Sequence, residues 1–151
     1  MSEIETFEDL EVWKRGCNLA VDLHVSLAES KDFALRNQME RSSLSIPSNI
    51  AEGAERDSTA DFIKFLRYSK GSCGELRTQL YISERVRQRL GAPALKESRT
   101  MINETRDISR MLQGLINSLK RRLQNSSTDH RSLGTHFSLT LPAFIKPCIA
   151  P

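Results

Sequence analysis

The sequence predicts an all-α fold, an antiparallel up-down-up-down four-helix bundle followed by a poorly structured C-terminal tail. Apolar residues recur at intervals of three and four over four long segments, which is the spacing of amphipathic helices. The breaks between these segments are short, and short connections join antiparallel neighbours in a bundle. Only nine of the 151 residues are aromatic, so aliphatic side chains must build the core.

The first two helices are predicted over about residues 7–30 and 35–55. Thr6 is a good N-cap for the first helix, with Asp9 three residues later to complete a capping-box-like pair. Residues 31–33 then form the turn that leads into the second helix.

The third and fourth helices are predicted over about residues 59–90 and 94–123. Ser58 caps the third helix, with Asp61 at the third helical position. The sequence Gly-Ala-Pro at residues 91–93 predicts a tight turn, because glycine ends helices and proline suits the first turn of the next one.

Residues 1–123 are therefore predicted to form the bundle, and residues 124–151 a polar linker and an apolar, proline-containing tail. Residues 124–129 are all polar, which is typical of a helix end. We expect the tail to be weakly ordered. The alternative is that its apolar residues cover a groove; these residues are Phe137, Leu139, Leu141, Phe144 and Ile145.

The centres of the second and third helices contain poor helix formers. The second is rich in serine and contains Pro47, which costs ~3 kcal/mol in an ordinary helix interior. The third contains Gly71 and Gly74, each of which costs ~1 kcal/mol relative to alanine. Close packing between the two helices must recover these losses.

An antiparallel register, counted outward from the connecting turn, places these two centres side by side. Arg41 then lies level with residues 73–75, and Asn49 level with residues 65 and 66. We expect Arg41 and Glu75 to form an ion pair in a partly dry layer. The predicted polar layer comprises Arg41, Ser45, Pro47, Asn49, Glu52, Gly53, Gly71 and Glu75. The favoured interpretation is that it fixes the helix register; the alternative is a polar pocket made by Asn49, Glu52, Gly71 and Glu75.

Two segments of these helices resemble a known family. Residues 45–53 read SIPSNIAEG, and residues 62–80 read FIKFLRYSKGSCGELRTQL. Both are similar to the signature of the four-helix-bundle family named after 23S ribosomal RNA intervening-sequence proteins, and residues 7–14 and 111–119 extend the likeness over about residues 7–123. The resemblance implies an antiparallel four-helix protomer, often a homopentamer. Related accessory proteins of diversity-generating retroelements bind a reverse transcriptase and nucleic acid.

The formal net charge of +3 hides an asymmetry along the chain. Residues 1–57 hold 6 Lys/Arg and 12 Asp/Glu, a net charge of −6, whereas residues 58–123 hold 14 and 6, a net charge of +8. The favoured interpretation is pairing of these charges across the bundle together with plain solvation. The alternative is a polarised surface.

Two clusters of cations are candidates for nucleic-acid binding, because binding to phosphates needs such clusters. The alternative is that cations near helix C-termini complement the helix macrodipole. The clusters are Arg85, Arg87, Arg89, Lys96 and Arg99 at one pole, and Lys120, Arg121 and Arg122 at the other.

No recognisable reaction chemistry is present in the sequence. It has no glycine-rich phosphate loop, paired CxxC or HExxH motif, and no histidine can be placed beside the conspicuous serines. His24 lies on or beside an apolar stripe, where histidines are usually only hydrogen-bonded. We therefore expect no catalytic residues, no metal site and no cofactor.

The cysteines and the hydropathy pattern indicate the cytoplasm. Cys17, Cys73 and Cys148 are odd in number and widely spaced, which indicates free thiols in a reducing compartment. No run of 18 uncharged apolar residues and no secretory signal are found, so no membrane association is expected.

These observations predict a cytoplasmic, non-enzymatic interaction module that assembles with itself, as a pentamer according to the resemblance. One hypothesis is that it binds structured RNA or DNA through phosphate contacts, beside a reverse transcriptase. The alternative is a protein-interaction or structural ring without a nucleic-acid role. Leu44, Val25 and Ile63 lie off the inner seam and are expected to leave apolar surface for burial between protomers.

Overall fold

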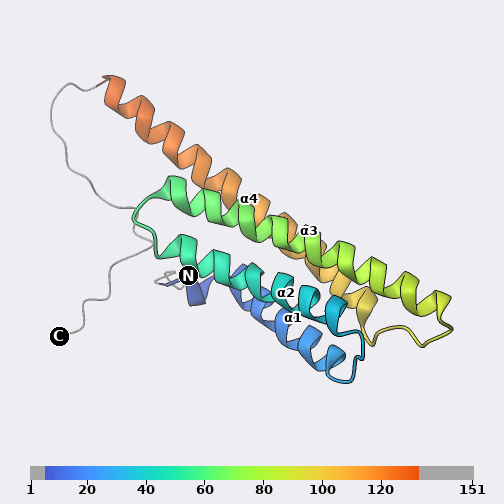
Figure 1. Cartoon of the computed structure of the whole chain (residues 1–151). Helices are drawn as coiled ribbons and strands as arrows, with labels where there is room; N and C mark the ends of the chain where they lie inside the picture. The colour runs from blue at the N-terminus through green and yellow to red at the C-terminus, as the bar shows by residue number, and fades with distance from the viewer. Residues whose placement is uncertain (1–5, 133–151) are drawn as a thin grey trace, which may run out of the picture.

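The computed structural model describes residues 6–132, with side chains described as far as residue 125. A short 3-10 turn precedes four long helices, and each helix runs antiparallel to the next along the chain (Figure 1). No strand occurs in the described range. The predicted all-α antiparallel four-helix bundle is therefore confirmed. Its elements are η1 (Phe7–Asp9), α1 (Glu11–Leu27), α2 (Phe33–Ala54), α3 (Thr59–Arg89) and α4 (Ser98–Ser132).

Side-chain caps determine where the helices begin. The Ser58 hydroxyl accepts a hydrogen bond from the Asp61 backbone N–H at 3.0 Å, as the sequence predicts. Thr6 and Asp9 form the predicted capping box, but they cap η1 and not a long helix. Leu10 then adopts an extended conformation, with φ −66° and ψ 118°, so α1 begins only at Glu11.

The turn between α3 and α4 is longer than the sequence predicts. Gly91 has φ +64°, as a helix-ending glycine does, and Glu97 also has a positive φ of 61°. A residue in this left-handed conformation cannot continue a right-handed helix. The predicted start of the fourth helix near residue 94 is therefore wrong, and α4 begins at Ser98.

Helix α4 continues through the segment predicted to be its end. Residues 124–132 are helical, so the predicted helix end near residue 123 is wrong. This segment contains neither glycine nor proline, and polar residues alone do not break a helix that satisfies its own backbone hydrogen bonds. In Figure 1 this end of α4, drawn in orange, extends past the start of α3. The predicted apolar tail, residues 133–151, lies outside the described residues.

The core is aliphatic, and each fully buried hydroxyl within it bonds to a backbone carbonyl. Ser43 donates to Glu40 O at 2.8 Å, and Thr105 donates to Ile102 O at 2.7 Å. None of the described helices is long and apolar enough to cross a membrane. The largest fully buried side chains include Leu23, Leu27, Met39, Ile46, Ile50, Leu66, Leu76, Leu80, Ile108, Leu112 and Ile116.

Candidate nucleic-acid interface

Helices α2 and α3 meet in the predicted register. The Ser72 hydroxyl on α3 donates to the Ser45 hydroxyl on α2 at 2.9 Å. One turn further along, the buried Ser69 hydroxyl donates to Ile46 O, also at 2.9 Å. These contacts lie where the count from the turn places them, so the small polar centres of the two helices do pack together.

The helix around Pro47 is supported by hydrogen bonds from side chains to backbone carbonyls. Pro47 is buried inside α2 and cannot donate to the preceding turn. The Ser48 hydroxyl donates to Leu44 O at 2.8 Å, and Asn49 Nδ2 donates to Ser45 O at 2.7 Å. Together with Ser69 of α3, these side chains supply donors to the turn that the proline disturbs. The layer is therefore part of the scaffold.

The expected ion pair between Arg41 and Glu75 is wrong. Both side chains are exposed, and no ion pair within 4.0 Å joins them. The residue that faces α3 at this level is Ser42, whose hydroxyl donates to Glu75 Oε2 at 3.5 Å. Because one residue corresponds to ~100° of rotation around a helix, Ser42 lies in the interface and Arg41 lies at its exposed edge. Glu52 is exposed as well and pairs with Arg56 at 2.7 Å.

The glycines of the polar layer occupy two different environments. At Gly53 an added Cβ would lie 2.6 Å from the Phe65 Cβ, so α2 and α3 are in close contact here. At Gly71 and Gly74 an added Cβ would meet nothing within 4 Å. The expectation that these two glycines let the helices close in is therefore wrong, because both face outward.

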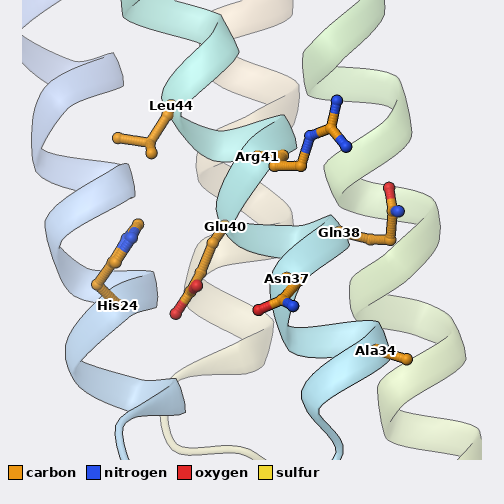
Figure 2. Close-up of a pocket in the computed structure, with 7 residues that line it drawn as sticks. All are labelled: His24, Ala34, Asn37, Gln38, Glu40, Arg41 and Leu44. Atoms are coloured by element: carbon orange, nitrogen blue, oxygen red, sulfur yellow. The ribbon is translucent and has the colours of Figure 1, made fainter.

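A shallow depression of about 540 Å³ lies between the outer faces of α1 and α2 (Figure 2). His24 lines it, and its Nδ1 is 2.8 Å from Ala20 O, as expected for a histidine that is only hydrogen-bonded. In Figure 2, Leu44 is directed toward α1, whereas Arg41 and Gln38 are directed toward α3. The described residues contain no group of three His, Cys, Asp or Glu that could hold a metal ion.

The first cation cluster, at the pole where α3 ends and α4 begins, is only partly paired. Arg87 donates to Pro93 O at 3.2 Å, and Arg99 Nε lies 3.5 Å from Glu84 Oε1. The other three members are exposed, and within the described part of the chain their side chains form no hydrogen bond or ion pair; they are Arg85, Arg89 and Lys96.

The second cluster lies along α4 and not at its end. Lys120, Arg121 and Arg122 are exposed, and α4 continues to Ser132. The macrodipole acts on charges within the last turn only. The interpretation that these cations complement the end of a helix is therefore wrong for this cluster, whereas Arg87 and Arg89 do lie in the last turn of α3.

The seam between α3 and α4 contains further cations that the sequence analysis missed. Lys70 Nζ donates to Gln113 Oε1 at 2.6 Å, and Arg106 Nη2 donates to the Tyr81 hydroxyl at 2.6 Å. These cations are dispersed along two helices and form no run in the sequence. Their spacing of seven residues, combined with the predicted antiparallel register, was the signal that could have revealed them.

An arginine of α1 binds the carboxylates of α4. Arg15 forms two hydrogen bonds of 2.6 Å to Glu104, and its Nη2 lies 3.5 Å from Asp107. The hydrogen bond from Arg110, together with the charges of Arg110 and Arg15, lowers the pKa of Asp107. In this contact the cation comes from the net acidic segment, residues 1–57, and the carboxylates come from the net basic segment, residues 58–123. The charge totals suggested the reverse, with acids of the first segment paired to cations of the second. The contact pairs a carboxylate of α4 with a cation of α1.

The comparisons with known proteins agree with this architecture. A solved protein with unknown function from the S23 ribosomal protein family of Bacteroides thetaiotaomicron VPI-5482 is 25% identical, with a TM-score of 0.62 over 70% of this chain and 97% of that chain. No curated protein matches the chain. The family model described as 23S rRNA-intervening sequence protein matches residues 8–114. The chain therefore belongs to the family of 23S rRNA-intervening sequence proteins.

Proposed function

We propose that the protein is a non-enzymatic, self-assembling interaction module that binds structured RNA or DNA through phosphate contacts. The observation that carries the proposal is the exposure of Arg85, Arg89 and Lys96 at the α3–α4 pole without a carboxylate within 4.0 Å in the described part of the chain. Exposed cations that release their counterions on binding are the main source of affinity for nucleic acid. The family description, which refers to 23S rRNA, supports RNA as the first ligand to test.

The Arg15 contact supports this proposal because it removes negative charge from the binding surface. Glu104 and Asp107 would otherwise oppose phosphate along α4, but Glu104 is held by Arg15 of α1, and Asp107 is paired with Arg110 and lies 3.5 Å from Arg15. The likeness to accessory proteins of retroelements extends the proposal to a reverse transcriptase as a protein partner.

The test is the salt dependence of binding to a structured RNA hairpin and to duplex DNA. Replacing Arg85 and Arg89 by alanine should weaken binding to all sequences and reduce the slope of log K against log salt by ~0.9 for each lost contact. The charge-matched control replaces Lys14 and Lys31, which are exposed in the acidic half. Failure of the unmutated protein to bind either ligand at ~50 mM salt would disprove the proposal.

A second candidate, a protein-interaction ring without nucleic acid, is favoured by one observation. Val21, Val25 and Leu44 on the α1–α2 side are 61%, 72% and 49% exposed. Exposed apolar side chains that gather on one face are typical of surfaces buried between protomers. The expectation that Ile63 contributes to such a surface is wrong, because Ile63 is only 5% exposed.

A further inference from the structure

Helices α3 and α4 carry matching rows of polar residues along their seam. On α4 the row is Arg99, Arg106, Gln113 and Lys120, and on α3 it is Lys70, Arg77 and Glu84. Members of each row are seven residues apart, which is close to two helical turns, so each row stays on one side of its helix.

Two pairs fix how these rows face each other. Glu84 on α3 lies 3.5 Å from Arg99 on α4, and Lys70 on α3 bonds to Gln113 on α4 at 2.6 Å. Arg77 is seven residues from both Glu84 and Lys70, and Arg106 is seven residues from both Arg99 and Gln113. The antiparallel register therefore places Arg77 level with Arg106 at the centre of the seam.

Among the residues whose side chains are described, no carboxylate lies within 4.0 Å of either guanidinium group. In the same part of the chain, the partners of Arg106 are neutral: the Tyr81 hydroxyl at 2.6 Å and Asn103 Oδ1 at 2.9 Å. Arg77 is half-buried, and no hydrogen bond or ion pair to its side chain is present among the described residues. Two positive charges at the same level of a helix pair repel each other, and no carboxylate among the described residues offsets this repulsion within 4.0 Å. An anion bound between the two guanidinium groups would offset it.

The surface beside this pair is open. Gly74, one turn before Arg77, has nothing within 4 Å of where a Cβ would lie. A ligand can therefore approach close to the α3 backbone at this point. Guanidinium groups hold phosphate oxygens through paired N–H donors, which a single lysine cannot do.

We propose that Arg77 and Arg106 form a phosphate-binding pair, and that the backbone of a double-stranded nucleic acid lies along the α3–α4 seam. The inference rests on the proposed function and names the residues that bind the phosphate at the centre of the seam. Arg99 and Lys120 lie three heptads apart, which is ~32 Å of helix at ~1.5 Å per residue. This length is close to the ~34 Å of one duplex turn. Exposed aromatic rings that could stack unpaired bases are scarce along the seam, and Tyr81 is already bonded to Arg106.

The test replaces both arginines with glutamine, which keeps hydrogen-bonding capacity and removes the charge. The Arg77→Gln, Arg106→Gln protein should bind a 20-base-pair duplex about tenfold more weakly at ~0.1 M salt, with a salt slope reduced by ~2. Its melting temperature should be nearly unchanged, because the relief of like-charge repulsion offsets the loss of the Arg106 hydrogen bond to Tyr81. Lys14→Gln, Lys31→Gln is the charge-matched control and should bind like the unmutated protein.

A second measurement uses inorganic phosphate alone. Phosphate stabilises folded proteins in general by its exclusion from their surface, so it should raise the melting temperature of both proteins relative to chloride at equal ionic strength. The rise should be larger for the unmutated protein than for the Arg77→Gln, Arg106→Gln protein. An equal rise in both proteins would show that the pair does not bind phosphate.

The remaining outcomes distinguish failure of the Arg77–Arg106 phosphate site from failure of the proposed nucleic-acid binding. If the Arg85 and Arg89 variant loses duplex binding while the Arg77 and Arg106 variant retains it, Arg77 and Arg106 do not form the phosphate site. The proposed binding of nucleic acid is then still supported. If the unmutated protein binds no nucleic acid, both are wrong. Equal affinity for a single strand of the same length would overturn the assignment to a duplex. Equal affinity for polyglutamate of matched charge would overturn the assignment to nucleic acid.

Discussion

Gly53 and Gly74 have opposite surroundings within the α2–α3 pair: Gly53 is in close contact with the neighbouring helix, and Gly74 is not. At Gly53 the neighbouring helix is so close that a methyl group would overlap the Phe65 side chain, with 2.6 Å between the two Cβ atoms. At Gly74 the surface is open. The sequence predicted close packing at Gly71 and Gly74, whereas the close contact lies at Gly53. Composition reveals that a helix contains glycines but not which way each one faces.

This contrast predicts opposite effects of the same substitution. Gly53→Ala should lower the free energy of unfolding by ~1–3 kcal/mol, because α3 must move or Phe65 must leave its rotamer. Gly74→Ala should raise it by up to ~1 kcal/mol, because alanine is the better helix former and meets no neighbour. Urea unfolding followed by circular dichroism measures both. Equal destabilisation by the two substitutions would contradict the placement of α3 against α2.

Cys73 gives a prediction about pH. The side chain is fully buried, and desolvation raises the pKa of its thiol from 9.0 to about 11, against smaller opposing effects of Ser109 and Arg77. Between these two pH values the unfolded chain has lost the proton and the folded chain has kept it. Stability should therefore fall as pH rises from about 9 to about 11, by roughly 3 kcal/mol from this group alone.

Comparison with a Cys73→Ala variant isolates this contribution, since tyrosines and lysines titrate in both proteins over the same range. The variant should be less stable at neutral pH, because a cavity replaces the thiol, but its stability should fall less between pH 9 and 11. Parallel pH profiles would show that the Cys73 thiol is not desolvated.

At the scale of helices, the register could be predicted from the sequence but the rotation of each helix could not. Short turns fix which residues of α2 and α3 are level, and the Ser45–Ser72 contact confirms this. The side that a residue faces changes by ~100° with each position, so Ser42 and not Arg41 meets Glu75. The extent of α4 was missed for a different reason, because a polar segment without glycine or proline carries no signal that stops a helix.

Arg15 takes the role that the sequence analysis gave to Arg41. It connects α1 to α4 through Glu104, and the two side chains are only 31% and 26% exposed. We expect Arg15→Ala to lower the free energy of unfolding by ~1–2 kcal/mol, between the values for exposed and buried pairs. Arg56→Ala, at a pair that is half exposed, should cost at most ~0.5 kcal/mol.

A double-mutant cycle with Glu104→Ala measures the interaction directly. A coupling energy near zero would show that the contact between α1 and α4 depends on packing alone. Arg41→Ala should be nearly neutral, since its side chain is exposed.

At the scale of the whole molecule, the charge asymmetry was visible in the sequence, but its consequence was not. Charge totals favoured neutralisation across the bundle, whereas the Arg15–Glu104 contact removes acids from the positive side. The level positions of Arg77 and Arg106 follow from the register of α3 against α4, whereas the sequence-based prediction considered only the register of α2 against α3. The result is a bundle with a cationic α3–α4 surface and an apolar patch on its α1–α2 side, formed by Val21, Val25 and Leu44.

The α1–α2 patch predicts how self-assembly can be disrupted without affecting the fold. Val25 is 72% exposed, so Val25→Glu should leave helical content and melting cooperativity unchanged. If copies of the protein pack through this patch, a charge placed in it must be buried without a partner, which costs several kcal/mol at each interface. Light scattering should then show an oligomer for the unmutated protein and a much smaller species for Val25→Glu. Lys14→Glu, on the same helix but outside the patch, is the control. A monomeric unmutated protein at micromolar concentration would refute self-assembly, and an unchanged oligomer in Val25→Glu would show that the protomers meet through another surface.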